Sequence, residues 1–289
     1  MHINMKYYIV TIGAIFISLG IGMLVGFNLN YDQELSKQQA QIINDLDVKF
    51  EDLRDTNNNL EAKLKNVNNS YDKVVDFINQ NVDKLIVEEL TDKYIGIIST
   101  NENCDTTNIY NTILKANGNV AFDIKLNSNI TDKSVLANLS SKLGEEIKST
   151  DELINYIIEA LKNEGAKDKL TYLEELGILT LSELSDSYQS YTSVVLTGKS
   201  SNKDLESQFK EIDKSLIDKI KSENKYVVGV EDAETKLSYI DLYSENKIST
   251  IDNINQGSGQ LALVLALKDE SIVGKFGISE NAESIIPFK

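Results

Sequence analysis

A mostly hydrophobic run lies near the start of this chain, from Tyr7 to Leu29. The run contains no charged residue, and Lys6 and Asp32 flank it. About 20 apolar residues cross a hydrocarbon layer about 30 Å thick, and their backbone groups must bond within a helix. We therefore predict a transmembrane helix over Tyr7–Leu29. The alternative is a cleaved signal peptide, but its apolar region spans only about 7–15 residues and ends in a small-residue cleavage site.

The orientation of this helix follows from the positive residues around it. Lys6 precedes the helix, and no Lys or Arg follows it before Lys37. Positive residues are retained on the cytoplasmic side of a membrane. We predict a single-pass protein of the cell membrane, with residues 1–6 as a cytoplasmic tail and the chain from Tyr31 onward outside the membrane.

A heptad pattern follows the apolar run. Between Gly26 and Gly96 the chain has neither Gly nor Pro, and large side chains recur at steps of four and three from Leu35 to Ile78. This is the a/d spacing of a left-handed coiled coil. We predict a coiled-coil stalk over residues 31–90 that makes the chain a homodimer. Its seam consists of Leu46, Phe50, Leu53, Asn57, Leu60, Leu64, Val67, Tyr71, Val74 and Ile78.

Two details bear on this pairing. Asn57 occupies a seam position, where a buried amide fixes register and strand number at a cost in stability. Within the apolar run, Ala14, Ser18, Gly22 and Gly26 recur every fourth residue and form one stripe of small side chains. Such a stripe is typical of membrane helices that pack closely in pairs. The alternative for the stalk is a lone amphipathic helix that folds back on the rest of the chain.

The periodicity changes near Thr91. Short apolar runs now alternate with amphipathic stretches, the pattern of strands joined by crossover helices in a mostly parallel sheet. We predict one α/β domain over residues 91–289, Rossmann-like but without the glycine-rich nucleotide fingerprint. The predicted strands are Lys93–Thr100, Asn119–Leu126, Tyr191–Thr197 and Tyr226–Val230. The predicted helices are Thr107–Ala116, Asp132–Leu143 (with Gly144 as its stop), Thr150–Asn163 and Asp204–Glu223.

Further stretches are less regular. Ala166–Ser187 is interpreted as mostly helical, and Leu237–Tyr243 and Lys247–Ile251 as additional strands. Gln260–Leu267 is apolar on every side, which predicts a fully buried helix or strand. Because a domain of about 190–200 residues buries a sufficient core, we expect residues Thr91–Lys289 to fold on their own.

The net charge, the single cysteine and the single proline restrict which partners and structures the chain can have. The net charge is −16, which disfavours nucleic acid as a partner, since phosphate binding needs clustered Lys and Arg. Cys104 is the only cysteine, so the chain has no intramolecular disulfide framework. The only proline is Pro287, and its place near the end leaves long helices uninterrupted.

Both ends of the chain resemble the MctB family. One match is the apolar N-terminal run followed at once by a coiled coil, and the other is the tail from STIDNINQGSGQLALVLALK to IIPF. The matching tail residues are Ile251, Asp252, Asn253, Gly259, Gln260, Ala262–Leu267, Gly274, Gly277 and Pro287. The resemblance implies copper transport or channel formation. A SteB-like branch of the family instead implies envelope assembly and cell division together with a SteA-like protein partner.

Copper ligands are few in this sequence. Cu(I) prefers the sulfur of Cys and Met, and Cu(II) prefers imidazole. The chain has Cys104, His2 and the methionines Met1, Met5 and Met23, without a C-x-x-C pair or a methionine-rich tract. We predict no specific copper site, no other metal site and no cofactor.

Patterns for nucleotide binding and catalysis are also weak. Thr197–Ser200 imitates the end of a phosphate-binding loop, but Ser193 stands where that loop needs glycine. His2 is the only histidine, so the domain has no Ser-His or Cys-His pair, and we predict that the chain is not an enzyme. Asp252-Asn253 is interpreted as a capped turn, with a small-ligand or peptide site as the alternative. Candidate carboxylates whose spacing defines no site are Glu102, Asp105, Asp123 and Asp252.

Two functions follow from these observations. The first is a dimeric membrane-anchored scaffold, which presents an α/β domain outside the membrane and acts in envelope assembly or cell division through a protein partner. The second is copper transport or pore formation, which rests on the family resemblance.

The stalk prediction can be tested by sedimentation equilibrium. At about 100 μM, where a moderate coiled coil at roughly −6 kcal/mol is largely paired, fragments from Tyr31 to Lys289 should associate more than fragments from Thr91. Charged residues at Leu60 and Leu64 should abolish the difference, because like charges cannot both be hydrated across a closed seam. Asn57→Leu should tighten association and loosen the choice of strand number. A monomeric long fragment would show that the stalk instead folds back on the domain or serves only as a spacer.

Overall fold

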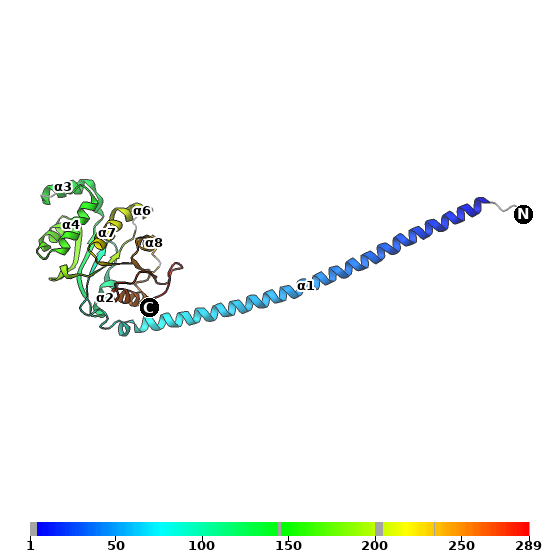
Figure 1. Cartoon of the computed structure of the whole chain (residues 1–289), viewed down its shortest axis with the longest axis horizontal. Helices are drawn as coiled ribbons and strands as arrows, with labels where there is room; N and C mark the ends of the chain where they lie inside the picture. Colours follow the sequence, from blue (N-terminus) through cyan, green and yellow to red (C-terminus); the bar gives the residue numbers. More distant parts are fainter. Residues whose placement is uncertain (1–4, 144–145, 200–204, 234, 289) are drawn as a thin grey trace. The chain divides into compact units, whose positions relative to one another are not determined.

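The computed structural model describes residues 5–143, 146–199, 205–233 and 235–288. The chain divides into two compact units, Met1–Asp72 and Lys73–Lys289 (Figure 1). Helix α1 (Met5–Leu85) runs through the first unit and supplies the start of the second. An apolar N-terminal helix, a long helix over 34–85 and an α/β domain confirm the predicted architecture.

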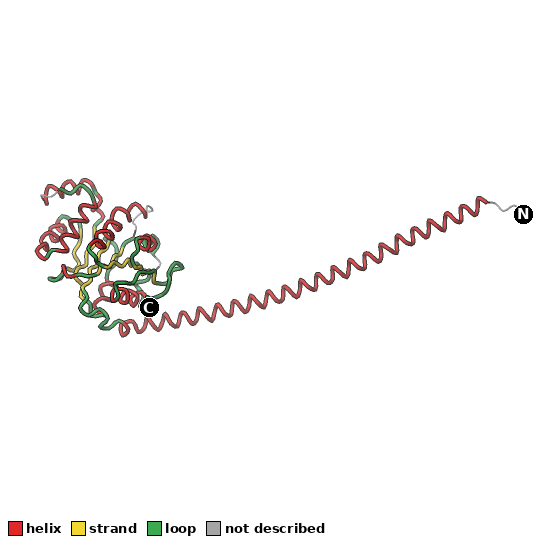
Figure 2. The backbone as a smooth tube through the Cα atoms, viewed as in Figure 1, coloured by secondary structure: helices red, strands yellow, loops and turns green. Residues whose placement is uncertain are grey.

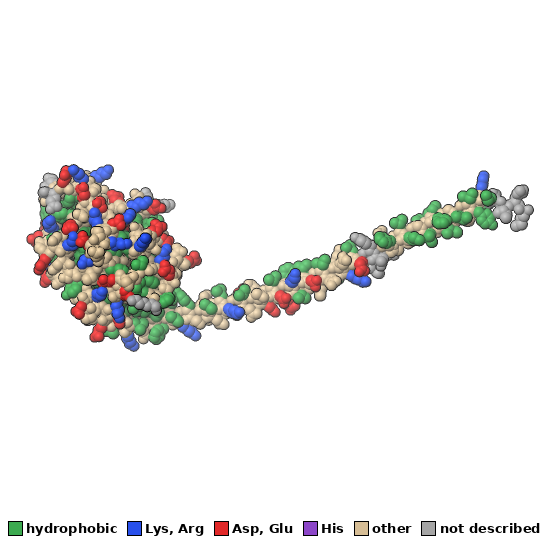
Figure 3. Space-filling view, viewed as in Figure 1, with side chains coloured by type: hydrophobic (Ala, Val, Ile, Leu, Met, Phe, Trp, Pro, Cys, Tyr) green, Lys and Arg blue, Asp and Glu red, His purple; other side chains and the backbone are tan. Residues whose placement is uncertain are grey.

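The first part of α1 is apolar enough and long enough to cross a membrane. Met5–Asn28 is the one helical segment of that kind among the described residues, and none of it is buried within the chain. Figure 3 shows hydrophobic side chains clustered along this part of the helix, with charged side chains beyond it. Tyr7, Phe16 and Leu24 are each about 70% exposed, so the rest of the chain does not cover these large apolar side chains.

The heptad residues of the stalk before Ile78 are solvent-exposed in the single chain. Leu53, Leu64 and Val67 are 64–65% exposed. Asn57 bonds only along its own helix, with its Nδ2 3.4 Å from Glu61 Oε1. The pairing of two stalks therefore stays a prediction.

Seven strands form one sheet in the order β3-β2-β1-β4-β5-β6-β7. All neighbouring pairs are parallel except β2 and β3, which are antiparallel. The strands are β1 (Tyr94–Ser99), β2 (Asn119–Leu126), β3 (Leu179–Leu184), β4 (Ser193–Thr197), β5 (Tyr226–Val230), β6 (Ser249–Ile251) and β7 (Lys275–Phe276). This order confirms the mostly parallel sheet predicted from the alternating pattern.

Helices cover both faces of the sheet (Figure 2). They are α2 (Thr107–Lys115), α3 (Lys133–Leu143), α4 (Thr150–Lys162), α5 (Lys167–Glu175), α6 (Leu205–Gln208), α7 (Lys214–Ser222), α8 (Ile240–Glu245) and α9 (Gly257–Lys268). A π-helical turn, η4 (Phe209–Asp213), joins α6 to α7. The predicted start of this helix at Asp204 and the predicted stop at Gly144 lie outside the described residues.

Side-chain alternation along the central strands divides the core into two layers. Ile97 faces the layer formed with α2, α9 and the end of α1, whereas Ile98 faces the layer of α4, α5 and α7. Both side chains are almost fully buried. Successive residues of a strand point to opposite faces, so strands covered on both sides are apolar throughout.

Two predicted segments differ from the structure. Ala166–Ser187 contains α5 but also strand β3, because Gly177 adopts a positive φ of 71° and ends the helix. Leu237–Tyr243 leads into helix α8 rather than forming a strand. Tyr239 and Tyr243 are four residues apart and fully buried, so they share one helical face.

The end of α1 and the turns that follow it, up to Leu90, belong to the core of the α/β domain. Ile78 and Val82 are 8% and 7% exposed, and Ile86 and Leu90 are completely buried. These four side chains share one hydrophobic cluster with α2 and α9. Ile78, assigned to the stalk seam from its spacing, thus packs within the domain in the single chain.

This packing predicts that the domain needs residues from Lys73 onward. Full burial of one large aliphatic side chain contributes about 1.5–3 kcal/mol, and a small domain has only about 5–15 kcal/mol of net stability. A fragment from Thr91 should therefore aggregate or unfold at a much lower urea concentration than one from Lys73. Within the longer fragment, Ile86→Ala should cost about 2–5 kcal/mol. Equal urea midpoints for the two fragments would contradict this role of the α1 end.

Candidate functional site

The carboxyl ends of β1 and β4 meet at the point where the strand order reverses. The chain leaves β1 toward β2 on one side and leaves β4 toward β5 on the other. Ligands of open parallel sheets bind in the crevice at such a switch point. Here Thr100 follows β1 and Gly198 follows β4, and the N–H of Thr100 donates to the carbonyl of Thr197 at 2.9 Å.

A buried carboxylate lies at this switch point. Asp213 is 0% exposed, and its Oδ1 accepts hydrogen bonds from Thr100 Oγ1 at 2.9 Å and from the Tyr243 hydroxyl at 2.7 Å. Burial raises the pKa of Asp213 to about 7, although both hydrogen bonds act in the opposite direction. Gly198 leaves room for this group, because a Cβ there would lie 2.2 Å from Thr100 Oγ1.

The π-helical turn η4 carries this carboxylate into the protein. Phe209, Ile212 and Asp213 are all buried, so the turn directs a charged side chain and two apolar ones inward. Single π-helical turns occur frequently at functional sites. The sequence holds a signal for Asp213, since it falls on the apolar stripe that continues through Leu216 and Ile220.

A cavity of about 300 Å³ lies beside this group, at the carboxyl ends of β1 and β2. Amide and hydroxyl side chains predominate in its lining, and Glu102 and Glu211 add two carboxylates. The loop after β1, the loop after β2 and the α6–η4 segment contribute the walls, with Thr100, Asn101, Asn127, Ser128, Ser207 and Ile212 among the lining residues.

A second buried carboxylate follows β5. Glu231 is 7% exposed and accepts from Ser238 Oγ at 2.5 Å and from the backbone N–H of Tyr239 at 3.3 Å. Burial is the main cause that raises the pKa of Glu231 to about 7; the two hydrogen bonds oppose this shift, and the nearby charges of Asp252 and Asp241 add to it. The side chain thereby binds the residues that lead into α8.

The tail-motif residue Asp252 binds the C-terminal segment. Its Oδ1 accepts from the N–H of Ile278 at 2.8 Å, and its Oδ2 accepts from the N–H of Ser279 at 3.0 Å. Gly277 has a φ of 137°, and a Cβ there would lie 1.8 Å from Asp252 Oδ1. Only glycine fits both this conformation and this close approach.

The other motif residues organise the start of α9. Asn253 is completely buried, and its Nδ2 donates to Ser258 Oγ at 2.9 Å. Gly259 allows close packing, because a Cβ there would lie 2.1 Å from the Asn253 carbonyl oxygen. Gln260 is partly exposed, and its N–H donates to the Gln256 carbonyl at 3.0 Å in the first turn. The motif thus joins loop, helix and C-terminal segment in one hydrogen-bonded structure.

The structure does not bring the four candidate carboxylates into one site. Each has its own donor: the N–H of Ser128 for Glu102, the N–H of Thr107 for Asp105, Thr106 Oγ1 for Asp123, and the segment after Gly277 for Asp252.

The stretch that resembles the end of a phosphate-binding loop makes contacts within the domain. Gly198 packs on Thr100, Lys199 Nζ donates to the Asn103 carbonyl at 3.2 Å, and Ser200 lies outside the described residues.

The sulfur atoms considered as copper ligands are divided between the two units of the chain. Cys104 is 8% exposed, and burial raises the pKa of its thiol. A protonated thiol is a poor metal ligand, since metals bind the thiolate. Met5 and Met23 are exposed on α1, whereas Met1 and His2 lie outside the described residues.

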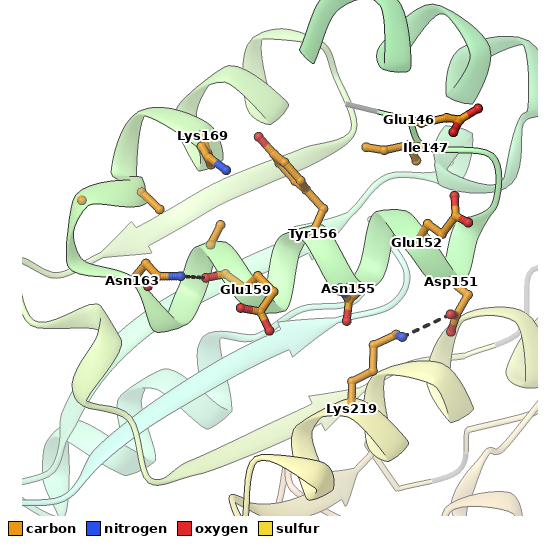
Figure 4. Close-up of a pocket in the computed structure, with 13 residues that line it drawn as sticks. Glu146, Ile147, Asp151, Glu152, Asn155, Tyr156, Glu159, Asn163, Lys169 and Lys219 are labelled. Atoms are coloured by element: carbon orange, nitrogen blue, oxygen red, sulfur yellow. Dashed lines mark hydrogen bonds and ion pairs between the residues drawn. The ribbon is translucent and has the colours of Figure 1, made fainter. Parts of the chain in front are cut away.

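A larger groove of about 640 Å³ lies away from the sheet, beside α4 (Figure 4). Tyr156 projects from α4 into it, and Lys169 Nζ lies 4.8 Å from the centre of the Tyr156 ring. At one end Asp151 forms a 3.1 Å ion pair with Lys219 of α7. Charges of both signs therefore line this groove.

The predicted dimerisation residues of the anchor occupy one side of α1. Ala14, Ser18, Gly22 and Gly26 are each four residues apart in a continuous helix. A Cβ at Gly22 or Gly26 would meet nothing within 4 Å, so both glycines are accessible to another helix. Their pairing is untested by the single chain.

Comparison with known proteins identifies the chain by its family. Residues 2–287 match the family model described as "Copper transport outer membrane protein, MctB". No curated protein matches the chain.

The buried Asp213 predicts a specific pH dependence of stability. Its pKa is about 7 in the folded protein against an ordinary value of 3.8, so folding favours the protonated form. That contribution is fully present below pH 3.8 and is lost as the pH rises through 7. The stability of Asp213→Asn relative to wild type should therefore rise between pH 5 and 7, by up to about 1.4 kcal/mol per pH unit, and level off above.

Urea unfolding of the Lys73–Lys289 unit at several pH values measures this difference. Glu231 is present in both proteins, so its titration cancels. Asp186→Asn removes a fully exposed carboxylate and controls for the change in net charge. A flat difference for Asp213→Asn would show that Asp213 titrates alike in the folded and unfolded states.

Proposed function

The chain belongs to the MctB family, and we propose that it is a membrane-anchored component of copper transport. One observation carries the proposal, namely the family match over residues 2–287. The apolar segment Met5–Asn28 supports membrane attachment. On this evidence copper transport is favoured over the scaffold function expected from the residues alone.

The proposed role is carried by protein contacts rather than by chemistry on the copper ion. Cys104 is the one thiol, and burial in the domain keeps it protonated and inaccessible. The buried carboxylates Asp213 and Glu231 are engaged by hydroxyl and backbone donors of the fold. On this basis we propose a non-enzymatic role for the domain.

The same proposal includes a homodimer and an orientation. The small-residue stripe from Ala14 to Gly26 and the exposed heptad residues of the stalk support two parallel copies. Lys6 before the apolar segment supports a cytoplasmic N-terminus and an extracytoplasmic domain.

A second candidate is a scaffold of envelope assembly or cell division with a SteA-like protein partner. The burial of Cys104 favours it, because the domain then presents no accessible soft ligand through this side chain. In this case the α/β domain would recognise its partner with no involvement of copper.

Deletion and complementation distinguish the two candidates. For copper transport, a strain lacking the chain should show altered cell-associated copper, measured by mass spectrometry of washed cells, and normal septation. The wild-type chain and Cys104→Ser should both restore the copper content, since the thiol is proposed to have no part in transport. A variant that ends before Lys37 should not restore the copper content, because this variant lacks the α/β domain.

The outcomes separate clearly. A septation defect with unchanged copper content would overturn copper transport in favour of the scaffold. Failure of Cys104→Ser alone, at wild-type protein level, would show instead that the chain binds copper through its thiol.

A further inference from the structure

The start of α9 is capped by a residue of α1. The N-cap residue Gln256 forms no side-chain cap of its own helix. Instead Asn79 Oδ1 accepts a hydrogen bond from the N–H of Ser258 at 3.1 Å. Side-chain oxygens at a helix N-terminus satisfy N–H groups that have no partner within the helix. Here the cap comes from a residue 179 positions away in the sequence.

The fit around this cap leaves no space. A Cβ at Gly257 would lie 2.7 Å from the Cα of Asn79 and 3.0 Å from its Oδ1. Lys268, at the other end of α9, forms an ion pair with Glu89. Both ends of α9 are thereby attached to the chain segment that leads out of the stalk.

A second hydrogen bond extends inward from the cap. Ser258 is completely buried, and its Oγ accepts from Nδ2 of the equally buried Asn253 at 2.9 Å. Asn253 follows Asp252 directly, and Asp252 accepts from the N–H groups of Ile278 and Ser279. Asn79 of α1 is therefore connected through Ser258, Asn253 and Asp252 to the C-terminal segment.

That segment, residues 274–284, forms the edge of the sheet and is here called the strap. It pairs with β6 through the two-residue strand β7. The N–H of Thr250 donates to the Gly274 carbonyl at 3.0 Å, and the N–H of Asp252 donates to the Phe276 carbonyl at 3.2 Å. Gly277 and Ser284 close it with a 3.0 Å backbone bond. Because β6 and β7 pair over only two residues, the two hydrogen bonds to the Asp252 carboxylate contribute a large share of the hydrogen bonding between the strap and the sheet.

We propose that the end of α1 controls the attachment of the strap to the sheet. When Asn79 caps α9, the Ser258–Asn253 bond holds Asp252 in the position that binds Ile278 and Ser279. When the Asn79–Ser258 bond opens while the apolar packing of α1 stays in place, this support is lost, the strap loosens and the edge of β6 becomes accessible. The device connects the membrane-anchored helix with a sheet edge and stands independently of copper transport.

Hydrogen–deuterium exchange on the full-length chain in detergent micelles tests the coupling. Asn79→Ala should raise the exchange rate of the strap amides of Ile278 and Ser279 about tenfold, the effect of about 1.4 kcal/mol on local opening. Asn79→Asp keeps an acceptor oxygen for the Ser258 N–H and should retain most of the protection. Asp252→Asn weakens the strap bonds directly and should raise the same rates.

Asp83→Ala is the matched control. It removes an exposed 2.8 Å ion pair with Lys115 from the same end of α1 and leaves the cap in place. It should leave strap exchange unchanged. The proposal is overturned if Asn79→Ala raises exchange only in the first turn of α9, or if Asp83→Ala raises strap exchange equally. Unchanged strap exchange in Asp252→Asn would also overturn it.

Discussion

The α/β domain depends on the burial of α9 between the sheet and the end of α1. This helix is apolar on every side, with Leu263, Val264 and Leu267 fully buried. A helix of that kind is stable only when every face is covered by protein or lipid. The sheet covers one face, and Ile78, Val82 and Ile86 belong to the same cluster. The helix that carries the apolar segment Met5–Asn28 therefore completes a core formed mainly by the C-terminal half of the chain.

The carboxyl edge of the sheet shows how buried charge is accommodated. Removing a carboxylate from water is costly unless donors compensate for the lost hydration. Asp213 has two hydroxyl donors, and Glu231 has one hydroxyl and one backbone donor, yet the pKa of both stays raised by burial. Asp252, in contrast, binds two backbone N–H groups of the strap. The first two groups stabilise the interior, and the third joins two chain segments.

The sequence predicted the central part of the fold because its signals are local. The strands β1, β2, β4 and β5 are continuous apolar runs, and the apolar helix and the heptads follow from spacing alone. Strand β3 was missed because an edge strand with one exposed face lacks such a run. The segment leading to α8 was misassigned because its two buried tyrosines fit either period over so short a stretch.

The candidate site was less predictable, since it depends on contacts between distant segments. Asp213 lies in the apolar stripe of its helix, a local signal, but its partners Thr100 and Tyr243 come from other elements. The tail motif was recognisable as a pattern, whereas its attachment to Asn79 depends on tertiary packing. Ile78 continues the heptad spacing, and only the fold shows that it packs in the domain.

The long separation between Asn79 and Ser258 has a consequence for the order of folding. The α1 segment leaves the ribosome first among the elements of this core, and α9 and the strap leave nearly last. Contacts between such distant segments raise the contact order of the domain, which slows its folding. During synthesis Ile78, Val82 and Ile86 stay exposed until α9 has been made. Exposed apolar side chains of this kind make the nascent domain a natural client of chaperones.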